Sequence, residues 1–312
     1  MILESETRKG YYISAEMKKV WSVEMDLLKK LLEVCEKHHL KIWAEGGTLL
    51  GAVREKGYIP WDNDIDMAML REDYDKLRDV SSKEFKSPYF FQCGYTDLFP
   101  NGQSKLRKDG TAAIIKADIF QKFHQGIFID IFPLDILPDD DEEFNNFLLL
   151  RNKEKNKLKV YCEHYFSFTN WKYNVKVLRN YYAINKIGFN NFFKRYDNLI
   201  KKYCSNNGEK VSIISWSDDR RYIRNRKWYD GTLFFHFEDI LIPVPIGYHE
   251  ILSKQYGDYM KPINEASQHG SFLILDTEHS FLDYLPKLRK GHRWDSWKVR
   301  LNTFKSFFQN ES

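Results

Sequence analysis

The sequence predicts an α/β protein in which a mixed β-sheet is flanked by helices and an additional helical region is laid on this core. Three observations predict the class. Over the first 140 residues, segments of period-two polarity alternate with segments whose apolar residues recur every three or four positions. The composition, 43% hydrophobic over 312 residues with only 16 Gly and 9 Pro, provides a substantial core and excludes low-complexity classes. A Lys-, Asn- and aromatic-rich stretch without proline, residues 139–202, predicts the additional helices.

The first predicted helix covers residues 14–40. Ser14 is a suitable N-cap, and apolar residues recur at helical spacing after it. A short strand at 41–44 leads into the turn Glu45-Gly-Gly-Thr48, which opens a helical run. Gly57 stands where a left-handed residue often ends a helix. The predicted order is therefore strand, glycine turn, helix.

The strand pattern resumes after Pro60. Residues 64–69 alternate polar and apolar side chains, and residues 71–80 return to helical spacing. A strongly apolar strand at 126–132 is expected to be halted by Pro133. Further strands are predicted at 89–93, 104–107 and 112–115.

Three regions are expected to form one compact unit. They are a core of residues 1–140, a basic and mainly helical region of residues 141–230, and a carboxy-terminal segment of residues 231–312 packed on the core. Residues 151–230 carry 19 Lys and Arg against 7 Asp and Glu, although the net charge of the chain is only +4. Such a stretch suits nucleic acid, an anionic glycan, a membrane surface, or a set of solvated helix faces, and charge alone does not choose among them.

The chain shows no sign of export or of membrane insertion. Its amino terminus lacks the apolar stretch of a secretory signal, and no apolar run approaches the ~20 residues that a bilayer-spanning helix needs. The four cysteines are far apart and form no Cys-x-x-Cys pair, which predicts reduced and mostly buried thiols. We therefore expect a cytoplasmic protein.

Asp64 and Asp66 are the first candidates for chemistry. In a strand, residues two apart point to the same face, and at ~3.3 Å per residue their backbones lie about 7 Å apart. Two like charges on one face repel unless a cation lies between them, so the pair suits a divalent-metal site, with Mg²⁺ or Mn²⁺ as the preferred ions. The alternative is an edge strand with two solvated acids.

Two further features favour the metal site. Gly46, Gly47 and Thr48 join a strand to a helix, where backbone N–H groups and the positive helix end make a phosphate cradle. Asp130 interrupts an apolar strand and would be costly to bury without a metal or a donor. A cradle and three acids are the parts that hold two metals ~4 Å apart around a phosphate undergoing in-line displacement.

Three basic residues are candidates for contact with the phosphates. Arg54, on the helix after the cradle, can hold two phosphate oxygens at once, and the equal alternative is a surface residue. Lys105 and Arg107 have the same parity on a predicted strand between the acid motifs. If the substrate carries a quaternary ammonium group, Trp61 or Tyr58 beside the acid motif are candidate aromatic walls.

The sequence resembles the LicD family, which includes bacterial phosphorylcholine transferases and the catalytic part of fukutin-type proteins and belongs to the nucleotidyltransferase-fold superfamily. The resemblance rests on ordered motifs within residues 40–140. These motifs are EGGTLLGAVR from Glu45, IPWDNDID from Ile59 and FIDIFPLD from Phe128. Later blocks, FED from Phe237 and YGDYM from Tyr256, look similar too, whereas the basic middle region shows the least likeness.

The resemblance implies a nucleotidyltransferase-like core and a Mg²⁺-dependent (or Mn²⁺-dependent) transfer of phosphocholine from CDP-choline to a sugar hydroxyl, with release of CMP. In fukutin-like relatives the group is ribitol phosphate. Asp64, Asp66 and Asp130 would bind the metal, with Asp130 alternatively taking the acceptor proton, and Gly46, Gly47 and Thr48 would contact the diphosphate. Asp62 would have a supporting role, and Asn63 stands where many members have a third acid.

The implied partners are a CDP-alcohol donor and a glycan or glycolipid acceptor of teichoic acid, lipopolysaccharide or capsule type. Peripheral contact with the cytoplasmic membrane face is expected, and nucleic acid is not. Alternatives are transfer of ribitol or glycerol phosphate, nucleotidyl transfer from an NTP, a glycosyltransferase that uses Asp-x-Asp, and a non-catalytic glycan-binding protein. A glycosyltransferase is disfavoured because only one helix, one strand and the glycine turn precede Asp64.

Overall fold

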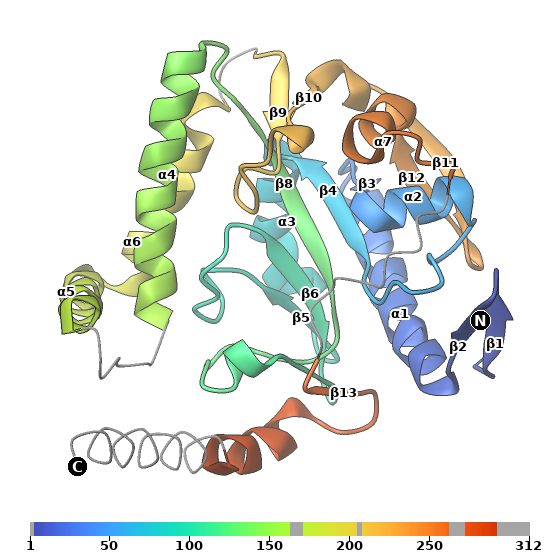
Figure 1. Cartoon of the computed structure of the whole chain (residues 1–312), viewed down its shortest axis with the longest axis horizontal. Coiled ribbons are helices and arrows are strands. Elements are labelled where there is room, and N and C mark those ends of the chain that lie inside the picture. The colour runs from blue at the N-terminus through green and yellow to red at the C-terminus, as the bar shows by residue number, and fades with distance from the viewer. Residues whose placement is uncertain (1–2, 163–170, 205–207, 262–271, 292–312) are drawn as a thin grey trace, which may run out of the picture.

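The computed structural model describes residues 3–162, 171–204, 208–261 and 272–291. It confirms the α/β class: helices surround a mixed sheet (Figure 1). The helices are α1 (Ala15–Lys37), α2 (Gly46–Arg54), α3 (Arg71–Glu84), α4 (Asp141–Cys162), α5 (Trp171–Ile187), α6 (Phe189–Ile200) and α7 (Tyr248–Tyr256). In the described residues no helix is long and apolar enough to cross a membrane.

The central sheet is built around one long strand, β8 (Phe128–Ile136). On one side β8 pairs in parallel with β4 (Asp66–Leu70), which continues antiparallel to β3 (Trp43–Ala44). On its other side β8 pairs antiparallel first with one partner strand and then with another. These partners are β6 (Ser104–Lys108), extended by β5 (Tyr89–Gln92), and β9 (Lys210–Ser212), extended by β10 (Arg224–Asn225).

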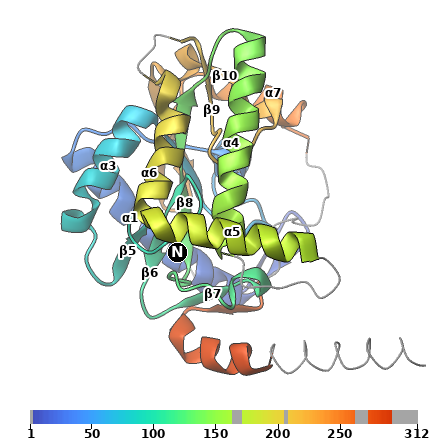
Figure 2. The ribbon, with the colours of Figure 1, turned by 90° about the vertical axis from the view of Figure 1, so that its left-hand side faces the viewer.

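Smaller two-stranded sheets lie around this core. They are β1 (Glu6–Arg8) with β2 (Tyr11–Ile13), β11 (Thr232–Phe237) with β12 (Ile240–Pro245), and β7 (Ala112–Ile114) with β13 (Ile274–Asp276). Helices α1 and α3 lie behind the sheet in Figure 1 and at the left in Figure 2, while α4, α5 and α6 form a layer at one side. One continuous cluster of buried apolar side chains joins α1, the sheet, α4, α6 and β12.

The sequence places most elements correctly and misplaces some ends. Ser14 caps α1 as predicted, accepting a hydrogen bond from the Met17 amide at 3.2 Å. Strand β8 does not stop at Pro133, because this residue falls between Ile131, the last one paired with β6, and Asp135, the first one paired with β9. The missing N–H of proline therefore interrupts no ladder on that side.

The end of α2 also differs from the prediction. Lys56, with φ of 59°, takes the left-handed conformation that was expected at Gly57. Gly57 is needed for a different reason: a Cβ there would collide with the carboxylate of Glu238. That carboxylate in turn accepts hydrogen bonds from both terminal nitrogens of Arg8, at 2.5 and 2.9 Å. The hairpin β1–β2 is thereby tied to the hairpin β11–β12.

The cysteines agree with the expectation of buried thiols as far as the structure describes them. Cys35 and Cys93 are buried and free, and Cys204 is free and half-buried. Burial raises the pKa of the Cys35 thiol to about 12, so it stays protonated at neutral pH. The side chain of Cys162 lies outside the described residues.

Candidate active site

Three charged residues lie abreast on neighbouring strands of the sheet. Asp66, the first residue of β4, is in register with Asp130 on β8, and Asp130 is in register with Lys105 on β6. Residues in register point to the same face of a sheet, so these three side chains share one space. Asp64 precedes the strand instead of lying in it as predicted, although the amide of Asp130 still donates to the Ile65 carbonyl at 2.9 Å.

Asp62, Asp64, Asp66 and Asp130 form a group of like charges that repel one another. Burial, and after it the charges of Asp64 and Asp130, hold the pKa of Asp66 well above its ordinary value. Burial and the neighbouring Asp64, which is within hydrogen-bonding distance, do the same to the pKa of Asp62. Such a group is costly without a cation close by.

Lys105 supplies part of the missing positive charge. Its Nζ donates to both carboxylate oxygens of Asp130 at 2.7 Å, beneath the ring of Phe128. Within the described ranges, no three His, Cys, Asp or Glu side chains are yet arranged as metal ligands are. The donor set, carboxylate oxygens at a helix N-terminus with surplus negative charge, nevertheless has the oxygen chemistry that a hard divalent cation prefers.

The glycine turn is shaped by the acids that face it. Gly46 has φ of +53°, which favours glycine, and a Cβ there would lie 3.3 Å from an oxygen of Asp66. A Cβ on Gly47 would collide with an oxygen of Asp62. The backbone at the start of α2 therefore approaches both carboxylates as no other residue type permits.

Thr48 has a different place from the one expected. Its side chain is buried, and its hydroxyl accepts a hydrogen bond from the amide of Asp66 at 2.9 Å. Thr48 does not line the neighbouring cavity. The structure thus gives it the role of fixing the start of β4 against α2, where the sequence predicted a contact with the diphosphate.

We expect Gly47→Ala to reduce activity by about 10²-fold, because the new methyl group displaces Asp62 and with it the carboxylate of Asp64, and misplacement by ~1 Å costs about that much. Steady-state kinetics measure the loss. Gly291→Ala is the matched control, since a Cβ at Gly291 meets nothing within 4 Å. Equal activities of the two variants would contradict this account of the turn.

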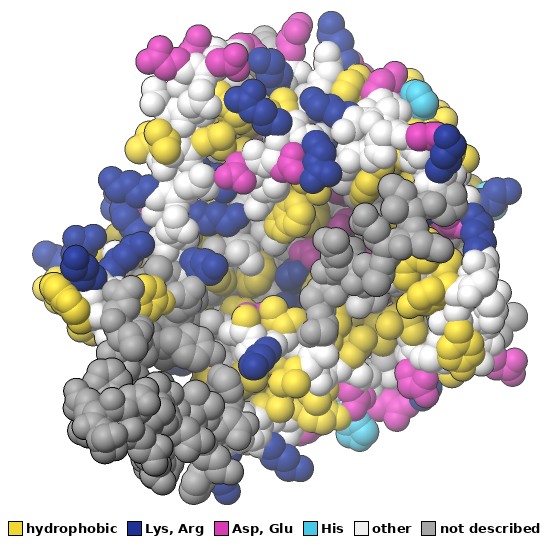
Figure 3. Space-filling model, in the orientation of Figure 1, with side chains coloured by type: hydrophobic (Ala, Val, Ile, Leu, Met, Phe, Trp, Pro, Cys, Tyr) yellow, Lys and Arg dark blue, Asp and Glu magenta, His cyan; other side chains and the backbone are white. Residues whose placement is uncertain are grey.

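A cavity of about 550 Å³ opens in front of the glycine turn. On the neighbouring part of this face, Figure 3 shows Lys and Arg side chains gathered over the layer of α4 and α5. Arg54 lines the cavity, with Nε donating to Glu55 at 2.6 Å and a terminal nitrogen donating to the Tyr259 carbonyl at 3.0 Å. The cavity is otherwise lined by Gly46, Gly47, Leu50, Ile59, Trp61, Asp62, Asp64, Asp66, Asp130, Phe132, Trp216, Arg221, Tyr222, Gln255, Tyr256, Asp258, Tyr259 and Lys261. We call it the glycine cavity.

A second cavity, of about 760 Å³, lies on the other side of the acids and is lined by β6, β7 and α4; we call it the α4 cavity. It shares Asp64, Asp130 and Trp216 with the glycine cavity. Lys105 and Arg107 line only this second cavity. The guanidinium of Arg107 donates to Gln92 at 2.6 Å and to the Gly126 carbonyl at 2.7 Å.

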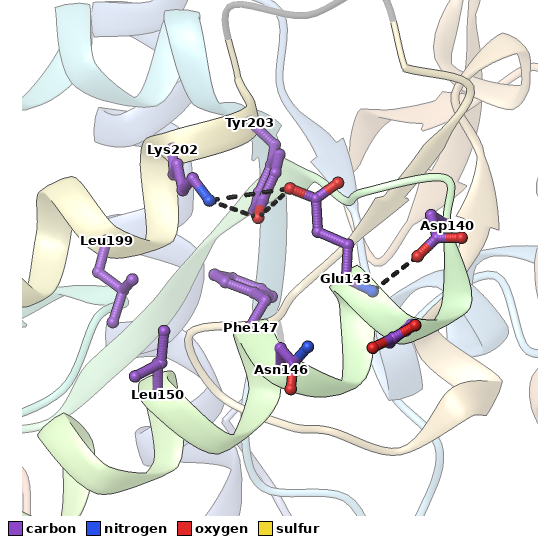
Figure 4. A pocket seen from close by; sticks show the side chains of 9 residues that line it. Asp140, Glu143, Asn146, Phe147, Leu150, Leu199, Lys202 and Tyr203 are labelled. Atoms are coloured by element: carbon purple, nitrogen blue, oxygen red, sulfur yellow. Dashed lines mark hydrogen bonds and ion pairs between the residues drawn. The ribbon is translucent and has the colours of Figure 1, made fainter.

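Other pockets lie elsewhere. One of about 310 Å³ between α4 and α6 contains none of the residues singled out from the sequence (Figure 4). Its polar contacts, among them Tyr203 Oη to Glu143 at 2.8 Å, join α4 to the turn that follows α6. The structure therefore concentrates the candidate chemistry at the boundary between the glycine cavity and the α4 cavity.

The sequence did not reveal one buried ion pair at the site. Glu45, the N-cap residue of α2, accepts bonds from both terminal nitrogens of Arg224 on β10 at 2.5 Å, and both side chains are buried. Tyr229 and Gln255 complete the surroundings of Arg224. The only signal in the sequence was the position of Glu45 next to the glycines, and nothing marked Arg224.

The aromatic residues near the site divide into two groups. Tyr58 is a core residue, stacked on Trp21 with ring centroids 4.3 Å apart, so it is not the aromatic wall that the sequence suggested. Trp61 does line the glycine cavity. Three further rings reach the same cavity from distant segments, namely Trp216, Tyr222 and Tyr256.

Comparison with known proteins connects this geometry to a family. Residues 39–165 match the family model described as LicD/FKTN/FKRP, nucleotidyltransferase domain. The lipopolysaccharide cholinephosphotransferase LicD of Haemophilus influenzae is 26% identical over 252 residues, which cover 78% of this chain and 91% of that protein. Two other relatives match shorter segments: an uncharacterized protein of Rickettsia prowazekii (42% over 106 residues, 34% of this chain and 36% of that protein) and the human ribitol 5-phosphate transferase FKRP (39% over 51 residues, 16% and 10%).

The matched span of 39–165 contains the glycine turn, the acids around Asp64 and the strand that carries Asp130. The similarity to the Haemophilus protein extends over most of both chains. On these grounds residues 39–165 match a nucleotidyltransferase domain of the LicD/FKTN/FKRP type, and the chain is similar over most of its length to the Haemophilus LicD protein.

Proposed function

We propose that the protein transfers phosphocholine from CDP-choline to a sugar hydroxyl of a cell-surface glycan precursor, with Mg²⁺ and with release of CMP. One observation carries the proposal: Asp64, Asp66 and Asp130 meet beside the N-terminus of α2, between two cavities. In addition, the Haemophilus relative is named a cholinephosphotransferase. A glycan precursor attached to lipid would bring the protein to the inner membrane face.

The reaction requires a phosphate to be held for in-line attack. The acceptor oxygen attacks the phosphorus that bears choline, the bond to the bridging diphosphate oxygen breaks, CMP leaves and the hydroxyl proton is released. The amide groups at Gly46 and Gly47 and the guanidinium of Arg54 would bind the diphosphate in the glycine cavity. Asp64 and Asp66 would hold Mg²⁺, which would supply charge stabilisation to the phosphate oxygens.

Asp130 can interact with Lys105 or with a group bound in either cavity. It faces both cavities and is paired with Lys105. Burial raises the pKa of Asp130 although the Lys105 contact opposes the shift. In our proposal Asp130 completes the metal site or receives the acceptor proton, and Lys105 balances whichever carboxylate charge is left.

The choline group would lie against the aromatic wall of the glycine cavity. Quaternary ammonium groups bind over aromatic faces, and Trp61, Trp216, Tyr222 and Tyr256 line this cavity together with the acids. A ribitol or glycerol group would need hydrogen-bonding side chains at the same place instead. The aromatic character of the wall is the reason for preferring choline.

A thermal-shift panel tests the donor without knowledge of the acceptor. The purified protein is heated with Mg²⁺ and CDP-choline, CDP-ribitol, CDP-glycerol, CTP or UDP-glucose, because a ligand that binds the native state raises the melting temperature. At 100 times its Kd a donor adds about 2.7 kcal/mol to the free energy of unfolding, a shift of several degrees. We expect the shift with CDP-choline, dependent on Mg²⁺ and absent in Asp66→Asn.

Each other outcome of the panel changes the proposal in a defined way. A shift with CDP-ribitol or CDP-glycerol alone keeps the phosphotransferase and changes the alcohol. A shift with CTP alone points to nucleotidyl transfer, and one with UDP-glucose alone points to glycosyl transfer. No shift with any nucleotide sinks the enzymatic proposal in favour of a glycan-binding protein.

A further inference from the structure

Helix α4 directs a row of positive charges into the α4 cavity. Arg151, Lys155 and Lys159 are spaced four residues apart, so they lie on one face of the helix, and all three line the cavity. Lys105 and Arg107 line the opposite wall, from β6. Asp118 and Asp218 also line the cavity, besides the acids of the active site.

Arg151 is the unusual member of this row. Its side chain is 2% exposed, and its Nε and Nη2 are buried without a hydrogen-bond partner. The nearest carboxylate, that of Asp218, lies 3.9 Å from Nη2, beyond hydrogen-bonding distance. A buried guanidinium with two unused donors is costly unless a ligand accepts from them.

The positive charges that line the α4 cavity are incompletely balanced by the protein. Burial, and next the charge of Arg151, lower the pKa of Lys155 to about 8. Burial lowers the pKa of Arg107 to about 10 and lowers that of Arg151 as well. The Nζ of Lys155 donates hydrogen bonds to the carbonyl oxygens of Ser215 and Trp216, which are neutral groups. An anion in the cavity would restore the balance.

We propose that the α4 cavity binds the sugar acceptor through a phosphate group that the acceptor already carries, with Arg151 and Lys155 as its ligands. The proposal rests on the proposed function, because it assigns the second substrate of the same reaction. Phosphate is the anion that best fits a planar guanidinium beside an ammonium group.

The different linings of the two cavities favour the acceptor, and not the donor, as the ligand of the α4 cavity. The glycine turn opens only into the glycine cavity, so the donor diphosphate has a cradle there. Asp64 and Asp130 stand at the boundary, where a hydroxyl from the α4 cavity can reach a phosphorus on the other side. Phe99, Phe123 and Phe128 add apolar walls against which the face of a sugar ring can lie.

Isothermal titration calorimetry with simple probes tests this inference. Inorganic phosphate, glucose 6-phosphate and glucose are titrated into the full chain, with and without saturating CDP-choline and Mg²⁺. We expect glucose 6-phosphate to bind, glucose not to bind, and CDP-choline to leave the binding of the sugar phosphate undiminished. Binding of inorganic phosphate measures the anion subsite alone.

Two variants on the same helix test the assignment of the binding to Lys155. Lys155→Gln should weaken glucose 6-phosphate binding about tenfold, the value of one charge-assisted hydrogen bond. Lys153→Gln makes the same charge change at an exposed residue outside the cavity and should leave binding unaltered. Neither change empties a buried position, so folding is not the limiting factor.

The results distinguish this inference from the proposed function. Absence of sugar-phosphate binding, or equal weakening by the two lysine variants, overturns the inference while CDP-choline binding stands. Displacement of the sugar phosphate by CDP-choline also overturns it, because the anion subsite then serves the donor. Failure of CDP-choline to bind contradicts the proposed function and removes the acceptor role with it.

Discussion

Asp66→Asn is expected to lower activity by at least about 10³-fold while making the metal-free protein more stable. The loss follows because a metal ligand contributes several kcal/mol of stabilisation to the transition state. The gain follows because Asp66 lies among like charges that raise its pKa, so an uncharged amide relieves repulsion. Turnover of the donor and melting in EDTA measure the two effects.

Because activity should fall while stability rises, simple misfolding of Asp66→Asn cannot explain both results. Adding Mg²⁺ should raise the melting temperature of the wild-type protein and leave that of Asp66→Asn nearly unchanged. Asp79→Asn is the matched control, because Asp79 is an exposed residue of α3 paired only with Arg78. A variant at Asp66 that keeps at least half of the wild-type activity would refute the assignment of this carboxylate to the metal.

Arg71→Met is expected to reduce the free energy of unfolding by about 3–5 kcal/mol, the usual result of removing one partner from a buried ion pair. Arg71 donates to both carboxylate oxygens of Asp135 at 2.6 and 2.8 Å and approaches Asp197 at 3.4 Å. The Asp135 side chain is fully buried. Because Asp135 lies on β8 and Asp197 on α6, the guanidinium joins the sheet to the helical layer. Urea unfolding followed by circular dichroism measures the loss.

Two further variants show whether the loss of stability comes from the burial of the ion pair or from the change of charge alone. Lys76→Met breaks the exposed pair with Glu72 on the same helix and should change the free energy of unfolding far less, because solvent screens exposed charges. The double variant Arg71→Met/Asp135→Leu should regain much of the stability, because the unpaired buried carboxylate is gone. If Arg71→Met and Lys76→Met cost the same, the pair is not a structural anchor.

The local part of the site could be predicted from the sequence. Gly46 and Gly47, the pair Asp64 and Asp66, and the isolated Asp130 all carry signals within a few residues of themselves, and the structure brings them together. The start of β4 was placed two residues too early because alternation continues through Asp64 into the extended segment before the ladder. Strand β8 continues beyond Pro133 because its partner strands pair on either side of that residue. This pairing depends on the tertiary structure and is not visible in the local sequence.

The distant part of the site could not be predicted. Arg224 meets Glu45 across 179 positions of sequence, and its neighbours Asn225 and Arg226 give it no distinguishing pattern. The walls of the α4 cavity come from β6, β7 and a helix whose three basic residues look like a solvated face in the sequence. Only the packing of α4 against the core shows that Arg151 is buried.

The tie between the two hairpins matters for how the protein should be tagged. Arg8 holds Glu238, whose carboxylate also accepts a hydrogen bond from the Tyr58 amide and packs against Gly57 just beyond α2. These contacts therefore fix the hairpin β1–β2 against the segment that follows α2. An affinity tag or a trimmed start in this segment would loosen α2, so a fusion partner there needs a flexible spacer that leaves Arg8 in place.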